Sequence, residues 1–217
     1  MLEELKQKVL EAALEAERSG LCKHKSGNFS ALDRVGGRMA ISPAGMRRED
    51  LTVEDVPILS LDGRILEAGA RGGPSSEYRM HAEAYRLRAD ILSVVHTHSQ
   101  YAAAFAVSGK PIRPVLFEAA FYGGCEIAVA AFARPGTEEL AKSIRGPLAS
   151  ADVCLLKNHG LLAVGGADIG ETLRKAAYAE DVARAYFLAL TLGGGREPDA
   201  ISAEAFEGYR RDRGVRA

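Results

Sequence analysis

Three short apolar runs, at 91–95, 153–156 and 161–164, limit what this chain can fold into. Short, mainly apolar runs bounded by turn residues are typical of strands buried on both faces. Such strands need helices on either side of the sheet to cover them. The helical and extended patterns alternate without the regular spacing of βαβ units. We therefore expect a mixed sheet between layers of helices.

The remaining patterns predict one domain over 1–217. Apolar residues recur at helical spacing over 2–19, and a longer helix begins at Asp168 and ends at the glycines 193–195. The tail, 196–217, is expected to be the most mobile part and to hold one short helix near 203–209. Further predicted helices are 77–88, 101–107 and 137–144; further predicted strands are 38–42, 57–61, 115–121 and 126–131; 23–36 is predicted to be a loop.

Composition excludes several classes of partner. The net charge is −1 over 217 residues, so no bulk electrostatic argument favours nucleic acid or an anionic membrane. No apolar stretch reaches the length of a membrane span, and no secretory signal pattern is present. The three cysteines lack CxxC spacing and fit reduced, mostly buried thiols. We expect a cytoplasmic protein.

Histidines follow two of the apolar runs. His96 and His98 are separated by one residue, and on an extended backbone such residues point to the same face. Their imidazoles can converge on one metal ion, although two surface histidines at a strand end are the plain alternative. His159 lies in Asn-His-Gly after the next apolar run, where it is either a turn residue or a third ligand. Three histidines would form the open nitrogen set typical of catalytic zinc.

Three polar segments offer donors for an anion. Ser75 and Ser76 precede a predicted helix with Glu77 in its first turn, which suits either an anion site or an ordinary helix cap. The segments 25–30 and 42–45 hold glycines and polar groups, and an ordinary turn is again the alternative. His81, one helical turn beyond Glu77, is expected at the rim of the same pocket or in a structural role, and His24 is read as structural or peripheral.

Together these motifs resemble the class II aldolase and adducin-head family, in particular its L-fuculose-1-phosphate aldolases. The resemblance runs from the first helix to about Gly193, and the motifs occur in the family's order. They are GNFS at 27–30, SPAG at 42–45, PSSE at 74–77, HTH at 96–98 and NHG at 158–160. The resemblance implies a three-layer α/β/α sandwich with a mixed, largely antiparallel sheet. It also implies a homotetramer with active sites at subunit interfaces.

The resemblance also implies roles for individual residues. Zinc, one ion per chain, would be bound by His96, His98 and His159. Glu77 would accept a proton and also ligate the metal. The substrate phosphate would be held by two glycines, the serine pair and their neighbours. These residues are Gly27, Asn28, Ala44, Gly45, Ser75 and Ser76.

The implied activity is metal-dependent cleavage of a ketose 1-phosphate to dihydroxyacetone phosphate and an aldehyde. Glu77 favours an aldolase, since the related ribulose-phosphate 4-epimerases carry aspartate there. The tyrosine that protonates the leaving aldehyde in this family is replaced by Phe117, and Tyr122 is the nearby candidate. Alternatives are aldolases of 5-deoxyribulose or 5-methylthioribulose 1-phosphate, a decarboxylase of a phosphorylated keto acid, and a 4-epimerase. A non-catalytic adducin-like assembly module is a further alternative, and it would lack the histidines.

Overall fold

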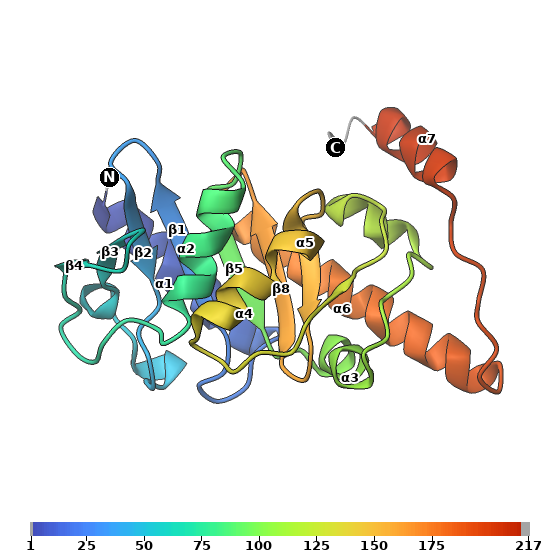
Figure 1. Cartoon of the computed structure of the whole chain (residues 1–217), viewed down its shortest axis with the longest axis horizontal. Coiled ribbons are helices and arrows are strands. Elements are labelled where there is room, and N and C mark those ends of the chain that lie inside the picture. Colours follow the sequence, from blue (N-terminus) through green and yellow to red (C-terminus); the bar gives the residue numbers. More distant parts are fainter. Residues whose placement is uncertain (1, 214–217) are drawn as a thin grey trace.

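An eight-stranded mixed sheet forms the centre of the molecule, in the order β4-β3-β2-β1-β5-β8-β7-β6. The computed structural model describes residues 2–213 (Figure 1). Every strand pair is antiparallel except β6 with β7. The strands are β1 (Asn28–Asp33), β2 (Arg38–Ile41), β3 (Ile58–Ser60), β4 (Ile65–Glu67), β5 (Ser93–Thr97), β6 (Val129–Ala130), β7 (Val153–Leu156) and β8 (Gly160–Gly165).

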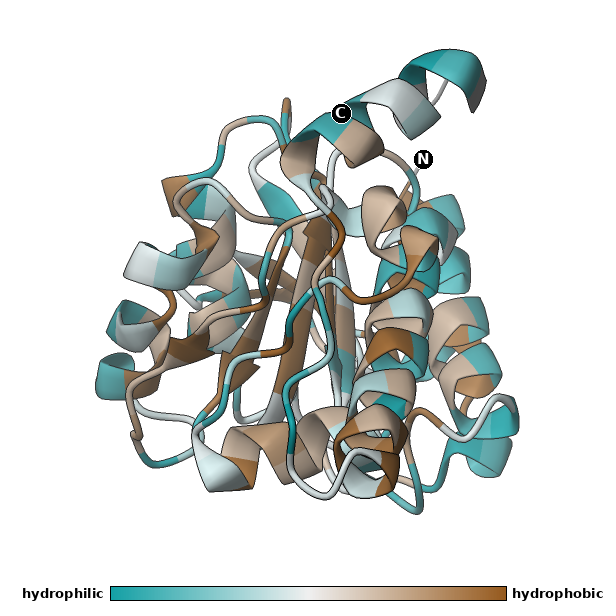
Figure 2. Cartoon of the chain, turned by 90° about the vertical axis from the view of Figure 1, so that its right-hand side faces the viewer, coloured by the Kyte–Doolittle hydropathy of each residue, from teal (hydrophilic) through white to brown (hydrophobic). Residues whose placement is uncertain are grey.

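Helices cover both faces of this sheet, which confirms the predicted sandwich with a mixed, largely antiparallel sheet (Figures 1 and 2). One layer holds α1, α3 and α6, and the other holds α2, α4 and α5. The α-helices are α1 (Leu2–Arg18), α2 (Tyr78–Leu87), α3 (Gln100–Ser108), α4 (Glu138–Ser143), α5 (Arg145–Leu148), α6 (Ile169–Leu192) and α7 (Ala203–Arg213). Three 3-10 helices are η1 (Arg48–Asp50), η2 (Val53–Asp55) and η3 (Phe117–Tyr122).

The central strands are apolar on both faces because each face packs on a separate core. In β5, Val95 belongs to the core under α1 and α6, whereas Val94 belongs to the core under α2. Leu161 and Leu162 divide in the same way in β8. This alternation explains why 161–164 is apolar throughout and why 91–95 is apolar apart from Ser93.

Two predicted segments were wrong. The segment 23–36 was predicted to be a loop, but β1 runs through it and pairs with both β2 and β5. Its polar residues Asn28 and Ser30 are fully or nearly buried and face the site described below. The segment 115–121 was predicted to be a strand, but η3 forms there. Ala119 and Tyr122 are buried three residues apart, which suits a helical turn.

Edges of the sheet also differ from prediction. The exposed edge strand β4 was missed, and only Val129–Ala130 of the predicted strand 126–131 is extended as β6. The long helix α6 begins as predicted, with the Asp168 side chain accepting hydrogen bonds from the backbone N–H groups of Gly170 and Glu171.

The predicted helix in the tail is confirmed as α7. Its Phe206 is buried, and the Phe206 ring lies 5.8 Å from that of Phe117 in η3. The mobility predicted for 196–217 and the assignment of 1–217 to one domain stay predictions, and residues 214–217 lie outside the described part. Over residues 2–213, no helix combines the length and apolar character needed to cross a bilayer.

Candidate metal centre and anion-binding loops

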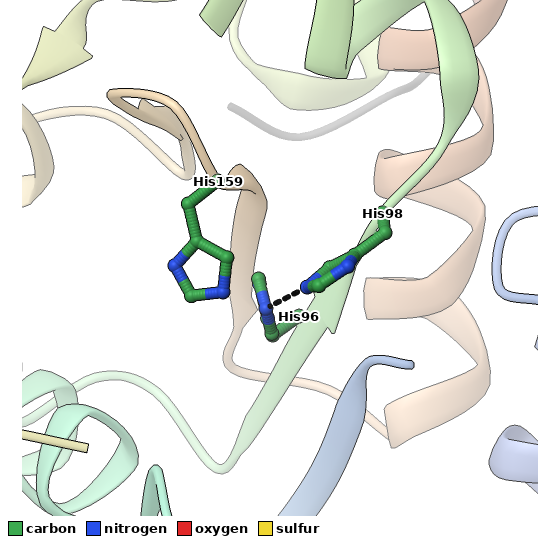
Figure 3. A group of neighbouring side chains, drawn as sticks. All are labelled: His96, His98 and His159. Atoms are coloured by element: carbon green, nitrogen blue, oxygen red, sulfur yellow. Dashed lines mark hydrogen bonds between the residues drawn. The ribbon is translucent and has the colours of Figure 1, made fainter. Parts of the chain in front are cut away.

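The three predicted histidines meet where β5 ends and β8 begins (Figure 3). Their ring centroids are 4.6 to 5.0 Å apart, and one ligand nitrogen of each lies within 4.8 Å of the others. The Nε2 atoms of His96 and His98 are 2.9 Å apart. His96 is fully buried, His98 is exposed and His159 is partly buried, so the cluster opens to solvent on one side.

Gly160 allows the Asn-His-Gly turn to approach β5. A Cβ atom on Gly160 would lie 2.3 Å from the Thr97 carbonyl oxygen and 3.2 Å from ring atoms of His96 and His98. Asn158 has φ +56°, a left-handed conformation that asparagine tolerates better than most residues. The missing side chain at Gly160 therefore lets the turn come close enough to β5 for the His159 ring to join those of His96 and His98.

The environment keeps these imidazoles neutral. Desolvation by the surrounding protein, reinforced by the neighbouring His159, lowers the pKa of the buried His96 well below its ordinary value; the same two causes lower the pKa of His98, whose ring is partly enclosed although the residue is exposed, to about 4. The Nδ1 of His96 lies 2.9 Å from the Leu161 carbonyl oxygen, to which it donates. This hydrogen bond leaves the lone pair on His96 Nε2 directed at the cluster. Neutral imidazole is the form that ligates a metal.

Glu77 places a carboxylate against the same cluster. Its Oε2 lies 3.3 Å from His96 Nε2, and its Oε1 lies 3.5 Å from His159 Nε2. Oε1 is buried and has no hydrogen-bond partner in the described part of the chain. A buried carboxylate oxygen without a partner is costly unless a cation compensates it. Three nitrogens and this oxygen therefore form a donor set that fits a divalent metal ion.

The local structure around Glu77 differs from the prediction. Glu77 is not in the first turn of the helix, because α2 begins at Tyr78 and Glu77 occupies the preceding cap position. Neither Ser75 nor Ser76 caps α2; instead Ser75 Oγ accepts a hydrogen bond of 3.3 Å from the Glu77 N–H. This contact helps to fix the backbone from which the carboxylate projects.

The predicted anion-binding segments lie side by side. The Ser75 N–H donates to the Ser42 carbonyl over 3.1 Å, and the Ser42 Oγ accepts from the Phe29 N–H over 3.1 Å. Ser76, Ala44 and Gly45 are exposed beside this junction. The N–H of Ala44 already donates to the Gly73 carbonyl over 2.9 Å, so Ala44 has no amide hydrogen left for a ligand.

Arg48 lies next to these loops, and sequence reasoning missed it. Its guanidinium donates to the carbonyl oxygens of Ser26 and Gly27, at 2.8 and 2.6 Å. The residue is only 3% exposed, and no carboxylate within residues 2–213 forms an ion pair with it. A buried cation without a counter-charge suits a loop that receives an anion. The residue lies outside all five motifs, so only the fold reveals it.

His81 is not at the rim of the pocket. It is fully buried behind Asn28, and its Nε2 lies 2.5 Å from Asn28 Oδ1. The Nδ2 of Asn28 in turn donates to Glu77 Oε2 over 2.8 Å. Asn28 stands opposite His96 in the pairing of β1 with β5, which is why it reaches the carboxylate.

Tyr122 and Phe117 lie away from the histidines of their own chain. Tyr122 is 1% exposed, burial raises its pKa, and it lines a cleft with Asp90 and Gly166. Those two residues lie at the end of β5 opposite His96. The structure therefore does not bring Tyr122 to the cluster within one chain. Phe117 is 42% exposed, and its ring meets that of Phe206 in α7 edge-on.

Comparisons with known proteins agree with this geometry. The family model described as class II aldolase and adducin N-terminal domain matches residues 7–187. A 5-deoxy-D-ribulose 1-phosphate aldolase of Bacillus thuringiensis serovar kurstaki is 37% identical, over 88% of this chain and 90% of that protein. A 5-methylthioribulose-1-phosphate/5-deoxyribulose-1-phosphate aldolase of Rhodospirillum rubrum is 31% identical, over 94% and 88%. A solved L-fuculose 1-phosphate aldolase superposes with a TM-score of 0.89 at 28% identity, over 97% and 96%. The chain therefore belongs to the class II aldolase and adducin N-terminal domain family.

Proposed function

We propose that the chain is a zinc-dependent aldolase that cleaves a ketose 1-phosphate to dihydroxyacetone phosphate and an aldehyde. The observation that carries this proposal is the cluster of three neutral imidazoles beside a buried carboxylate with one unpartnered oxygen. A non-catalytic assembly module has no need for that cluster. The proposal also rests on family membership, since the relatives named above are aldolases.

His96, His98 and His159 would hold the zinc, and Glu77 would be a further ligand in the resting site. When bound there, a divalent ion supplies Lewis-acid stabilisation of the negative charge that carbon–carbon cleavage leaves on the substrate oxygens. The three histidine ligands are neutral, so they leave the charge of the ion available for this task when substrate oxygens displace Glu77. The exposed side of the cluster, at His98, is where substrate would enter.

The protein's own groups account for binding and proton transfer. Gly27, Gly45 and the hydroxyls of Ser75 and Ser76 would hold the phosphate, with Arg48 supplying buried positive charge behind the loop. In the synthetic direction, Glu77 would remove the proton from C1 of dihydroxyacetone phosphate. Oε1 is the suitable oxygen for that proton, because Oε2 already accepts from Asn28.

The choice of substrate rests on the relatives and on Phe117. Phe117 stands where aldolases of the fuculose type have their proton-donating tyrosine, so the substrate can differ from fuculose 1-phosphate. We propose 5-deoxyribulose 1-phosphate as the first substrate to test, because the relative that acts on it is 37% identical to this chain. L-Fuculose 1-phosphate is the second, supported by the structural match. The proton for the leaving aldehyde would come from Tyr122 of a neighbouring subunit in a homotetramer. That role requires the buried hydroxyl to be uncovered on assembly.

The test is release of dihydroxyacetone phosphate from a panel of ketose 1-phosphates, followed by a coupled reduction to glycerol 3-phosphate. Glu77→Gln should keep zinc and lose cleavage and C1 hydrogen exchange together, by about 10²–10⁴-fold. Glu83→Gln is the matched control, because Glu83 lies on α2 but pairs with Arg145 away from the cluster. Full cleavage after exhaustive chelation, or wild-type exchange in the Glu77→Gln variant, would overturn the proposal.

Assembly and cellular location are part of the proposal. We expect a cytoplasmic enzyme, in line with the buried thiols of Cys22 and Cys154. The homotetramer would be measured by light scattering across a range of concentrations. A fully active monomer at every concentration would rule out a proton donor from a neighbouring subunit.

A further inference from the structure

Behind Glu77, four buried side chains form a continuous line of hydrogen bonds. Tyr85 Oη lies 2.8 Å from Ser30 Oγ, and Ser30 Oγ lies 2.6 Å from His81 Nδ1. His81 Nε2 lies 2.5 Å from Asn28 Oδ1, and Asn28 Nδ2 lies 2.8 Å from Glu77 Oε2. All five residues are at most 6% exposed. The line joins α2 to β1 and ends at the candidate catalytic carboxylate.

Each hydrogen in this line has only one possible position. The Asn28 amide nitrogen faces a carboxylate, so the Asn28 carbonyl oxygen faces His81 and must accept. His81 Nε2 must therefore carry a hydrogen. Burial lowers the pKa of His81 to about 3, so its ring is neutral near pH 7 and its Nδ1 is an acceptor.

The same reasoning continues through the hydroxyl groups. Since Nδ1 accepts, Ser30 donates its single hydrogen to His81, and the Ser30 oxygen is left to accept from Tyr85. Every donor then points from Tyr85 towards Glu77. A chain of aligned hydrogen bonds in a dry interior polarises its members in one direction and resists rotation of any one of them.

We infer that His81, as the neutral Nε2–H tautomer, is a positioning residue that holds Asn28 and thereby keeps Glu77 Oε2 occupied and Oε1 directed at the reacting carbon. This inference rests on the proposed function, because it assigns a purpose to the orientation of Glu77. It adds His81, Ser30 and Tyr85 to the residues on which the reaction depends, although none of them touches the substrate or the metal.

The orientation of Asn28 is what His81 controls. An asparagine amide can turn over, and that rotation would present its carbonyl oxygen to the Glu77 carboxylate. Two acceptors would then face each other, and the carboxylate would turn away. His81 opposes this rotation, because its Nε2–H would then face the NH₂ group of Asn28, and two donors would meet. A displaced base loses rate steeply, since misplacement of about 1 Å can cost about 10²-fold.

The first test measures the tautomer itself and needs no enzymatic activity. In protein labelled with ¹⁵N at the histidine rings, protonated and unprotonated nitrogens have well-separated ¹⁵N shifts, and His81→Gln identifies the His81 signals by their loss. We expect a protonated Nε2 and an unprotonated Nδ1 at pH 7. A protonated Nδ1, in either the other tautomer or an imidazolium, would overturn the inference.

The second test compares two replacements of His81. Leucine removes both hydrogen bonds, whereas the amide of glutamine can donate to Asn28 and accept from Ser30. We expect His81→Leu to lower kcat for C1 exchange by about tenfold to hundredfold with KM and bound zinc unchanged. His81→Gln should recover a substantial part of that loss. Wild-type kcat in the leucine variant, or equal losses in two equally folded variants, would refute a positioning role.

The hydroxyl groups provide a third test with matched controls, which also decides the matter if His81→Leu does not fold. Ser30→Ala should lower kcat by several-fold, whereas Ser93→Ala, which removes a buried hydroxyl bonded to Thr172, should not. Tyr85→Phe should act in the same direction, whereas Tyr186→Phe, which removes a buried hydroxyl bonded to Glu197, should not. Equal effects in each pair would show that only packing matters.

The two proposals fail separately. If the wild type neither cleaves ketose 1-phosphates nor exchanges the C1 hydrogen, the proposed function is wrong, and the tautomer measurement still reports whether the chain of donors exists. If the wild type is active and the tautomer is wrong, the aldolase proposal stands and the positioning role of His81 is refuted.

Discussion

Replacing Gly160 by alanine should disrupt the metal centre without touching a ligand. The added Cβ would lie 2.3 Å from the Thr97 carbonyl oxygen, whereas a close carbon–oxygen contact is about 3.3 Å. The turn must therefore move by about 1 Å relative to β5, and His159 moves with it. Metal–ligand distances tolerate only about 0.2 Å of error, so the site cannot absorb this shift.

The expected magnitudes follow from that displacement. Overpacking of this kind costs about 1–3 kcal/mol, which corresponds to a decrease of about 2–12 °C in the Tm of a chain of this size. Zinc affinity should decrease by about 10–100-fold, as is typical when the support of a ligand is disturbed. Calorimetry of metal-free protein and competition with a chelating dye would measure the two effects.

Gly208→Ala is the control. Gly208 lies in α7, and a Cβ atom there would meet no other atom within 4 Å. Alanine has the higher helix propensity, so this variant should keep its zinc affinity and gain slightly in stability. If Gly160→Ala instead binds zinc as the wild type does and unfolds at the same temperature, the close approach of the turn to β5 does not determine the geometry of the site.

Three further predictions concern the metal, the phosphate and acid stability. His98→Ala should keep the fold, because His98 is exposed, but bind far less than the one zinc per chain expected of the wild type by plasma mass spectrometry. Ser76→Asp should weaken binding of dihydroxyacetone phosphate by calorimetry far more than Ser76→Ala, since it adds like charge; equal effects would contradict the phosphate site. Because the folded pKa of His81 is about 3 and the unfolded value is about 6.5, its stabilising contribution is complete above pH 6.5 and is lost, at up to about 1.4 kcal/mol per unit, as the pH falls towards 3. In urea unfolding of metal-free His81→Gln, the free energy of unfolding should depend less steeply on pH between about 3 and 6.5 than in the wild type. An unchanged slope would contradict a buried, neutral His81 ring.

The cluster of three histidines could be predicted because its signals are local. A pair of histidines on one strand needs only the two-residue period of extended backbone, and Asn-His-Gly carries its own turn chemistry. The position of the third ring depends on strand pairing, yet both apolar runs already indicated strands buried at the centre of a sheet. The family's order of motifs supplied the remaining link to Glu77.

The support behind the centre could not be predicted in the same way. Ser30 and His81 meet only because β1 crosses beneath α2, and the segment containing β1 appeared to be a polar loop. Its polar residues are the ones that serve the site, so function obscured the strand pattern. Arg48 was missed for a related reason. Its partners are backbone carbonyl groups, which every residue carries, so no residue type in the sequence indicates the contact.

The segments that form the centre are far apart along the chain. Asn28 and His159 are separated by 131 residues (159 − 28), and Glu77 and His96 lie between them. Contacts over such separations form late in folding, because the entropy of loop closure must be overcome first. Until β8 has been synthesised and paired, the chain offers Glu77, His96 and His98 but not the third imidazole, because His159 directly precedes β8. A metal ion bound at this cluster would therefore meet its full donor set only on a nearly complete sheet, and it would stabilise the finished fold.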